Sequence, residues 1–331
     1  VWLEDSSPTG LELACDLGAG QPLSAQPAPA PSLVEVATPP VVAGDVVVHA
    51  LRNYPGAVVT DVASVKEPIA KCVLKRVPNL AQRYVGSHPM AGRERSGAAS
   101  ARADLFDARP WVLVATPATS PNALSAVRQL AIDLGALPTQ LGAAEHDRAV
   151  ALISHTPQLV ASALAARLEQ APEMALNLAG QGLRDTTRIA ASDPRLWAAI
   201  LNANRSSVSQ VLRELRVDID ALIEALEQGR GSVGTVVDVM QRGNLGRDRI
   251  PGKHGGAPSR YAEVMVLIPD APGQLARLFN DVGAAQVNIE DLVIEHSAGQ
   301  RQGLATLLVA PAAAVELRQA LEQQGWKIVA N

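Results

Sequence analysis

Three histidines lie in segments whose composition suits a pocket for proton chemistry. His88 lies in GSHPMAG, where a proline follows it and small residues leave room for a ligand. His146 lies in EHD, and His155 lies in SHTP on a predicted helix. A neutral imidazole has a pKa near neutral pH, so it is a suitable acceptor for the proton of a substrate hydroxyl. Because a single histidine at a strand end is more often structural than catalytic, the residue types alone leave both interpretations open.

Two further segments carry polar side chains where ligands commonly bind. In DVASVK, Ser64 and Lys66 follow a predicted buried strand, and open α/β sheets bind ligands outside the carboxyl ends of their strands. In DTTRIAASDPRLW, Arg188 lies on an apolar helix face. An arginine there either extends to the rim of the fold or neutralises an anion.

The glycine pattern of a dinucleotide loop occurs in an unsuitable context. The string GxGxxG at residues 229–234 follows a predicted helix, whereas a dinucleotide fingerprint follows a strand. Asp5 has a better context, because it follows a predicted strand at residues 1–4 and precedes a helix, where such folds place the carboxylate that binds the ribose hydroxyls. Taken alone, Asp5 is more often an N-cap. Residues 6–8 include no Lys or Arg for a 2′-phosphate, so NAD is expected over NADP.

The elements that position these residues alternate between strands and helices. Helices are predicted at 8–17, 41–53 and 121–134, with strands at LVEVAT, AVVTDVA, YVGSHPMAG and PWVLVATP. Such alternation is typical of a parallel sheet with helical crossovers. Residues 1–144 are therefore predicted to form one α/β domain.

Longer helices are predicted over residues 145–245. The clearest spans 205–228, and its apolar residues recur at spacings of four and three: Val208, Leu212, Leu215, Ile219, Leu222 and Leu226. This stripe fits a core helix or a helix–helix dimer seam, and we favour the seam. Gly229 is expected to cap the helix. The glycine-rich residues that follow it are expected to form a linker, and residues 246–259 are taken as the linker between the helical and C-terminal domains. Residues 260–331 then follow the strand–helix–strand–strand–helix–strand order of a ferredoxin-like unit.

Composition excludes several classes of protein. A chain of 331 residues that is 47% apolar exceeds one usual core, and its net charge of −4 argues against nucleic acid as a partner. No window approaches the roughly 20 apolar residues of a membrane span, and the first residues do not resemble a signal peptide. Cys15 and Cys72 have no Cys or His at metal-ligand spacing, so neither a disulfide framework nor a metal site is indicated. A cytoplasmic location is expected.

Taken together, DVASVK, GSHPMAGRERSG, LFDARPWVL, EHD, SHTP and DTTRIAASDPRLW, in this order and spacing, resemble a prephenate dehydrogenase of tyrosine biosynthesis. The resemblance covers nearly the whole chain, and HPMAG and TTRIA are specific to this family. The segment IPDAPGQLARLFNDVGAAQVNIEDLVIEH resembles an ACT regulatory domain. The resemblance implies a Rossmann-like α/β domain, an all-α dimerisation domain and an α+β ferredoxin-like ACT domain. It also implies NAD as cofactor, prephenate as substrate and a homodimer.

The resemblance assigns roles to individual residues. His88 would bond the 4-hydroxyl of prephenate, and Ser64 would support it near the nicotinamide. Arg188 would hold a substrate carboxylate, His155 would lie in the same pocket, and His146 would lie near its entrance. Glu94 and Asp185 would belong to a polar network that controls access to the pocket, and Trp197 would form part of its wall. The residues expected to hold NAD are Asp5, Thr38, Pro39, Val62 and Ser64. Tyrosine or phenylalanine would bind the ACT domain at Asp270, Pro272, Gly273, Asn288 and Ile289.

One departure from the family concerns the start of the chain. The family has a strand and a Gly-rich loop before the segment VWLED, so roughly 25 to 35 residues of the dinucleotide unit are expected to be missing, judged from the usual loop-to-acid spacing. Two alternatives stay open. One is an arogenate dehydrogenase, whose substrate has an amine where prephenate has a keto group. The other, which follows from the missing residues, is a non-catalytic amino-acid sensor that retains only ACT function.

Overall fold

The structure is a computed structural model of the chain and describes residues 1–24, 30–92, 97–229, 233–251, 261–296 and 302–329. The chain divides into two compact units, one made of residues 1–163 with 189–215, the other of residues 164–188 with 216–331. The expected domain boundary at residue 144 lies inside the first unit, because a helix that begins at Ala143 continues well past it.

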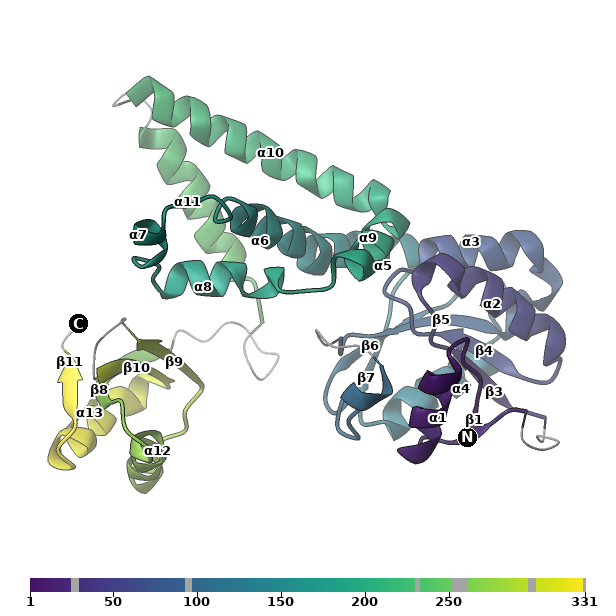
Figure 1. The fold of residues 1–331 in the computed structure, drawn as a ribbon, viewed down its shortest axis with the longest axis horizontal. Helices are drawn as coiled ribbons and strands as arrows, with labels where there is room; N and C mark the ends of the chain where they lie inside the picture. Colours follow the sequence, from purple (N-terminus) through teal and green to yellow (C-terminus); the bar gives the residue numbers. More distant parts are fainter. Residues whose placement is uncertain (25–29, 93–96, 230–232, 252–260, 297–301, 330–331) are drawn as a thin grey trace. The chain divides into compact units, whose positions relative to one another are not determined.

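A five-stranded sheet forms the centre of the first unit, in the order β3-β4-β5-β6-β7 (Figure 1). Its strands are β3 (Leu33–Val36), β4 (Val58–Asp61), β5 (Tyr84–Pro89), β6 (Pro110–Val114) and β7 (Leu137–Gln140). The prediction of a parallel sheet is confirmed for three pairs but wrong for β5 and β6, which are antiparallel. A parallel return needs a crossover of about a dozen residues, usually helical, whereas the described part of this connection holds a 3-10 turn at Ala98–Ser100.

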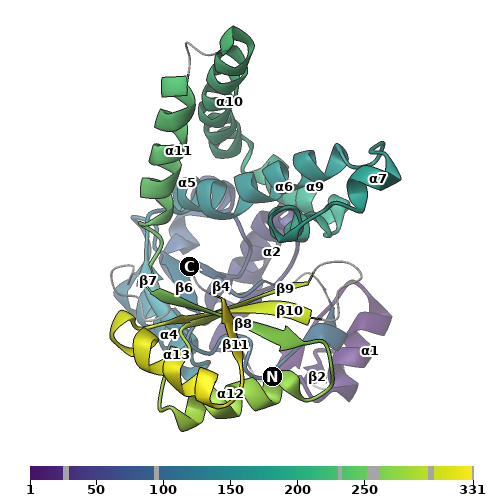
Figure 2. The same cartoon turned by 90° about the vertical axis from the view of Figure 1, so that its left-hand side faces the viewer.

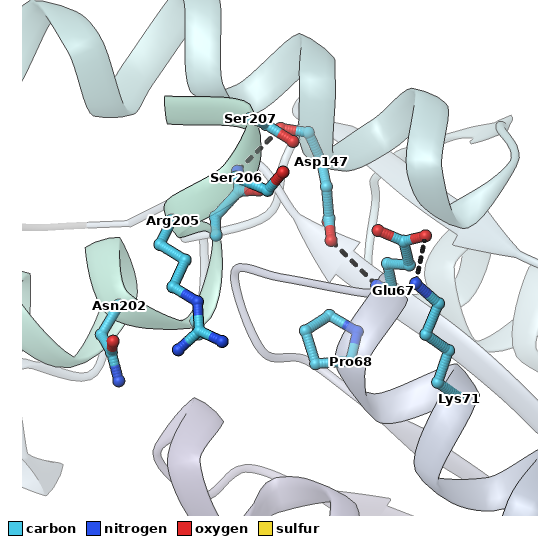
Figure 3. Close-up of a pocket in the computed structure, with 10 residues that line it drawn as sticks. Glu67, Pro68, Lys71, Asp147, Asn202, Arg205, Ser206 and Ser207 are labelled. Atoms are coloured by element: carbon cyan, nitrogen blue, oxygen red, sulfur yellow. Dashed lines mark hydrogen bonds and ion pairs between the residues drawn. The ribbon is translucent and has the colours of Figure 1, made fainter. Parts of the chain in front are cut away.

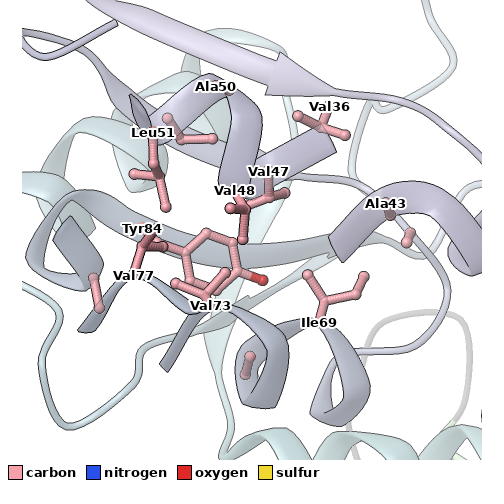
Figure 4. Packing of buried hydrophobic residues seen from close by; sticks show 14 residues of the cluster. Val36, Ala43, Val47, Val48, Ala50, Leu51, Ile69, Val73, Val77 and Tyr84 are labelled. Carbon is pink, nitrogen blue, oxygen red and sulfur yellow. The ribbon is translucent and has the colours of Figure 1, made fainter. Parts of the chain in front are cut away.

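Helices cover the sheet, and two of them, α2 (Pro40–Asn53) and α4 (Pro121–Asp133), lie where the sequence predicts helices, whereas α3 (Glu67–Arg76) was not predicted. α2 and α3 pack against β3, β4 and β5 around a core that includes Val47, Ile69 and Tyr84 (Figure 4). α4 contributes to a second cluster with β5 and β6. This packing fixes the carboxyl ends of β4 and β5, where the polar residues predicted to do chemistry begin.

The segment before β3 forms a small sheet of its own. β1 (Trp2–Leu3) and β2 (Gln21–Pro22) pair in parallel across α1 (Pro8–Asp16). Ser7 caps α1 by accepting a hydrogen bond from the N–H of Gly10, and Gly18 follows the helix with a φ of +80°. The predicted strand–helix order is confirmed, but β1 does not join the five-stranded sheet.

One continuous helix, Ala143–Ala166, opens the helical segment. It consists of α5 (Ala143–Val150), a π turn (Ala151–His155) and α6 (Thr156–Ala166). Among the described helices it is the one long and apolar enough to cross a membrane by length and composition. Its buried face nevertheless carries hydrogen-bonded polar residues, as the core helix of a folded site does.

The helix α10 (Arg205–Gln228) has the predicted bounds, and its apolar stripe is buried at its first residue and exposed at its last. Val208 is 4% exposed, whereas Ile219 is 45% and Leu226 is 73% exposed. Further helices are α7 (Glu173–Leu176), α8 (Gln181–Thr187), α9 (Pro194–Ala203) and α11 (Val233–Arg247).

The linker prediction is wrong for α11, because residues 233–247 of the glycine-rich segment are helical. Gly229 ends α10 with a φ of +77°, as expected of a capping glycine. In the GxGxxG string, Gly229 follows α10 and Gly234 lies within α11, whereas Gly231 lies outside the described residues; the string follows a helix, not the strand that a dinucleotide loop requires. Residues 252–260 of the expected linker lie outside the described residues.

The C-terminal part of the second unit has the predicted ferredoxin-like order. Its elements are β8 (Ala262–Pro269), α12 (Gln274–Ala284), β9 (Asp291–His296), β10 (Gln302–Val309), α13 (Ala314–Gln323) and β11 (Lys327–Val329). The four strands are antiparallel in the order β11-β8-β10-β9. Both helices lie on one face of this sheet (Figure 2), around a core that includes Val266, Leu278 and Leu317.

Candidate active site

His88 and His146 form a hydrogen-bonded pair. His88 lies near the end of β5, and its Nδ1 is 2.9 Å from Nε2 of His146 on α5. The two rings meet edge to face with centroids 5.1 Å apart. His146 is fully buried, because it lies on the inner face of α5, whereas His88 is half-buried. His146, which was expected near the entrance of the substrate pocket, is thus a buried hydrogen-bond partner of His88.

Asp147 contacts both this pair and the loop after β4. Its Oδ1 accepts hydrogen bonds from Nδ1 of His146 and from the N–H of Lys66, each at 2.8 Å. Its Oδ2 accepts the N–H of Glu67 at 2.9 Å (Figure 3). Since Glu67 begins α3, the carboxylate also caps that helix. One buried side chain thus connects the histidine pair to the loop that contains Ser64.

A buried ion pair lies beside β5. Lys66 and Asp61 are fully buried and form a salt bridge, and Nζ of Lys66 also donates to the Ser87 carbonyl at 2.6 Å. The hydroxyl of Tyr84 donates to Oδ2 of Asp61 at 2.7 Å. A Cβ at Gly86 would lie 3.0 Å from the Tyr84 hydroxyl oxygen and 3.2 Å from Cδ of Lys66, so glycine leaves the space that the lysine side chain needs.

Burial and the neighbouring groups keep His88 neutral. Burial lowers the pKa of His88 well below its ordinary value, and His146, Lys66 and His155 lower it further. Burial also lowers the pKa of Lys66, an effect that the carboxylate of Asp61 opposes. His88 therefore keeps a lone pair available at physiological pH.

His155 belongs to the same cluster. Its Nδ1 is 3.2 Å from Nδ2 of Asn204, which also donates to the Asp147 carbonyl at 2.7 Å. Its ring meets that of Trp197 edge to face, with centroids 6.1 Å apart. Burial lowers the pKa of His155 to about 4, although Asp147 opposes this, and His146 lowers it further. Because the Asn204 amide donates to Nδ1, the neutral ring carries its proton on Nε2.

A π turn gives His146 and His155 a common side of the helix. Nine residues of a regular α-helix rotate through about 900°, which would place the two side chains on opposite faces. The π turn Ala151–His155 is closed by the N–H of Thr156 donating to the Ala151 carbonyl. Its one extra residue reduces the angle between the histidines to about 80°. Both side chains are therefore buried in one cluster.

The residues expected to hold NAD lie around the carboxyl ends of β3 and β4. The hydroxyls of Thr38 and Ser64 are buried and have no hydrogen-bond partner among the described residues. A buried hydroxyl without a partner costs free energy, so both positions fit a bound ligand that supplies the missing bond. Pro39 is the N-cap residue of α2, and Val62 packs against the core beneath the sheet end.

Asp5 lies between β1 and α1, as predicted. It is exposed, and its Oδ1 accepts the N–H of Ser7 at 2.7 Å. This contact orders the entry to α1 and uses one of the two carboxylate oxygens.

The remaining predicted substrate residues lie on α8 and after it. Asp185 is exposed, and its Oδ1 accepts Nε2 of Gln181 at 2.7 Å. Arg188 is exposed at the start of the 3-10 turn Arg188–Ala190. Glu94 lies outside the described residues.

Two hollows lie away from the histidines. One, of about 370 Å³, lies beside Asp147 between the first turn of α3 and the junction of α9 with α10 (Figure 3), and its lining includes none of the three histidines. The other, of about 390 Å³, lies in the C-terminal part and is lined by residues 268–275 and Ile294.

The second hollow includes three of the five predicted regulatory residues: Asp270, Pro272 and Gly273. Gly273 has a φ of +84°, a conformation that favours glycine, and it caps α12. The other two do not line this hollow: Asn288 donates to Oε1 of Glu290, and Ile289 packs against the core.

Sequence reasoning did not assign several residues that the structure brings into this site. Asp147 has a local signal, because it follows His146 in EHD. Lys66 was noted in DVASVK at the end of a predicted strand, but its ion pair with Asp61 was not predicted. Asn204 has no local signal, since its contact joins residues far apart in the chain.

Two family models match the chain. The prephenate dehydrogenase nucleotide-binding domain matches residues 1–138, and the prephenate dehydrogenase dimerization domain matches residues 142–242. The first match shows that the nucleotide-binding domain is present, and it does not support the expectation that part of it is missing.

Individual proteins give the same result. The chain is 34% identical to the probable prephenate dehydrogenase NovF of Streptomyces niveus, over 98% of this chain and 91% of that protein. It is 28% identical to the prephenate dehydrogenase of Bacillus subtilis, over 71% of this chain and 64% of that protein.

Solved structures show the same fold. The prephenate dehydrogenase of A. aeolicus in complex with hydroxyphenyl propionate and NAD+ matches with a TM-score of 0.63 and 26% identity, over 74% of this chain and 88% of that chain. The arogenate dehydrogenase of Synechocystis matches over the same shares with a TM-score of 0.62 and 28% identity.

Proposed function

The chain belongs to the prephenate dehydrogenase family, and we propose that it catalyses the oxidative decarboxylation of prephenate to 4-hydroxyphenylpyruvate in tyrosine biosynthesis. It is an NAD-dependent dehydrogenase. The observation that carries the proposal is His88, which is neutral and engaged at Nδ1 by His146, so that Nε2 is the nitrogen left for a substrate.

The reaction makes a specific demand on this nitrogen. Prephenate loses a hydride from C4 and CO2 from C1 while its ring becomes aromatic. A base that takes the proton of the 4-hydroxyl in the transition state raises the electron density at C4 and favours departure of the hydride. His88 can accept that proton and return it to the phenolic oxygen of the product, so that no net proton is consumed.

NAD supplies the acceptor for the hydride, and the unpartnered hydroxyls of Thr38 and Ser64 fit its binding. We assign Pro39 and Val62 to the same NAD-binding surface as Thr38 and Ser64, and we assign Asp5 to hydrogen bonds with the ribose hydroxyls of NAD. Since residues 6–8 include no Lys or Arg, this assignment favours NAD over NADP.

We assign substrate binding to residues that complement a dianion. Arg188 pairs with a carboxylate, because a guanidinium stays charged and presents parallel donors. His155 offers an Nε2–H donor, and His146 acts through its bond to His88. The same proposal keeps Asp185 and Glu94 as gating groups and Trp197, which lies against His155, as a wall.

Arogenate is the second candidate substrate. The match to the Synechocystis arogenate dehydrogenase is as good as that to the A. aeolicus prephenate dehydrogenase, with TM-scores of 0.62 and 0.63. Arogenate differs from prephenate in its side chain, away from C4, so the chemistry assigned to His88 serves both.

We further propose that the C-terminal part is an ACT domain that binds tyrosine or phenylalanine and inhibits the reaction. The ferredoxin-like sheet order and the hollow beside Gly273 at the start of α12 support this. The exposed end of the α10 stripe supports a homodimer, and the described cysteines, both free, fit a cytoplasmic location.

Turnover with NAD tests the assignment. We expect NADH formation with prephenate at a higher kcat/KM than with arogenate. Saturable NADH binding without turnover of either compound would contradict the assigned substrates, and an absence of saturable NADH binding would favour the sensor alternative.

A further inference from the structure

We propose that Asp147 is a positioning residue that sets the tautomers of His146 and His88 and thereby makes Nε2 of His88 the proton acceptor. The inference rests on the proposed function for its catalytic consequence. The tautomers themselves are a property of the free protein and do not depend on it.

The argument begins with the carboxylate. Asp147 is 2% exposed, and its two oxygens receive the N–H groups of Lys66 and Glu67 as well as Nδ1 of His146. An ionised carboxylate only accepts hydrogen bonds. The third contact therefore requires that His146 carries its proton on Nδ1.

The tautomer of His146 decides that of His88. With Nδ1 protonated, neutral His146 presents a lone pair on Nε2, and this atom is 2.9 Å from Nδ1 of His88. His88 must donate from Nδ1 to satisfy the contact. Its own Nε2 is then unprotonated and can accept a proton from a substrate. Through two successive hydrogen bonds, the carboxylate of Asp147 thus determines that Nε2 of His88 is the nitrogen that accepts a proton.

The same chain stabilises the charge that appears during the reaction. When His88 accepts a proton, its Nδ1–H still donates to His146, and Nδ1–H of His146 still donates to Asp147. The negative charge of the carboxylate offsets the new positive charge, and the hydrogen bonds of the chain reinforce one another in a buried site.

The variant Asp147→Asn tests the proposal. The amide cannot keep all three contacts, because Oδ1 accepts from both His146 and Lys66. An amide that keeps its oxygen on the N–H of Glu67 presents NH2 in place of Oδ1, at the cost of the Lys66 contact, and this reverses the tautomer of the His146 ring and then that of His88. We expect kcat to fall by roughly 10²–10⁴-fold with little change in KM, as where an amide replaces the carboxylate that orients a histidine base. The matched control is Glu145→Gln, which neutralises an exposed carboxylate of the same helix and should leave kcat unchanged.

Nitrogen-15 NMR of the histidine rings, recorded without substrate, gives a readout that a purely structural role would not move. The wild type should show His88 and His146 protonated at Nδ1, and Asp147→Asn should show both protonated at Nε2. Wild-type rings protonated at Nε2 would overturn the proposal even if prephenate is turned over. The expected tautomers in a protein that turns over neither substrate would leave the inference intact and remove the proposed function.

A double-variant cycle covers the case in which Asp147→Asn merely destabilises α3. In a His146→Phe background, the hydrogen bonds that link Asp147 to His88 are already absent. Adding Asp147→Asn should then change kcat by less than about twofold if Asp147 acts through His146. A full additional loss of kcat would show that Asp147 acts by another route and would contradict the proposal.

Discussion

The histidine cluster (His88, His146 and His155) and the C-terminal hollow are built from different parts of the protein. The three histidines are buried or half-buried ionisable groups held by hydrogen bonds from several elements. The hollow is made almost entirely by one continuous segment, residues 268–275, which runs from the end of β8 through a left-handed glycine into the first turn of α12. Proton chemistry needs side chains removed from water and fixed from several directions, whereas recognition of a small ligand can be achieved by backbone shape and a helix N-terminus.

The difference has a kinetic consequence. Substitutions in the histidine cluster and at the proposed substrate residues should change kcat or KM. Substitutions in the C-terminal hollow should change only inhibition. The predictions below test this separation.

The largest effect is expected from His88→Asn. Removing the base should lower kcat by about 10²–10⁴-fold with a modest change in KM. In the wild type, the pKa of His88 lies below its ordinary value, so kcat should be full at neutral pH and fall as the pH decreases through that lowered value. Steady-state rates against pH should show that acidic limb in the wild type and not in the variant.

The matched control is His49→Asn, an exposed histidine on α2 that should not affect the rates. A retained acidic limb in His88→Asn, or a kcat like that of the wild type, would show that another group accepts the proton, and His155 would be the first candidate.

Arg188→Gln should mainly affect KM. A charge-assisted pair with a carboxylate contributes roughly 1.5–3 kcal/mol, and it exists before and during hydride transfer. KM for prephenate should therefore rise at least about tenfold while kcat falls less. Arg184→Gln, at an exposed arginine on the preceding helix α8, is the control. A large loss of kcat with unchanged KM would assign Arg188 to the transition state instead.

Asp270→Ala should weaken inhibition by tyrosine or phenylalanine several-fold, because the residue lines the C-terminal hollow at the start of α12. Without inhibitor, kcat should equal that of the wild type, and Glu322→Ala on α13 should behave as the wild type in both assays. Inhibition that persists unchanged in Asp270→Ala would place the inhibitor elsewhere, most simply at the substrate site beside the histidine cluster.

The smallest effect is expected on stability in acid. The pKa of His155 is about 4 in the folded protein and near 6.5 in an unfolded chain, so below pH 6.5 the unfolded chain binds more protons. The stability is fully present above pH 6.5 and declines toward about pH 4, lowering the melting temperature by a few degrees. His155→Gln should reduce this pH dependence of melting, and an equally steep dependence in that variant would assign it to other groups.

Much of the fold follows from the sequence, because local patterns determine single elements. The periodicity of α10 predicted its bounds correctly, and glycines at the ends of α1 and α10 marked where these helices stop. The linker prediction failed at α11 because glycine-rich composition was given more weight than the apolar residues within 233–247. The antiparallel β5–β6 pair was missed because strand direction depends on the connection and not on the strands.

For the candidate site, the sequence alone determined which side chains are available and which segments carry them. Motifs such as HPMAG, EHD and SHTP each lie within a few residues, so they were visible without a fold. Only the tertiary structure decided how these side chains connect. Asp147 meets the N–H groups of Lys66 and Glu67 about eighty residues away, and a π turn rotates His155 to the side of His146. Hydrogen bonds between distant segments and the phase of a helix depend on packing of the whole chain, and no local pattern encodes them.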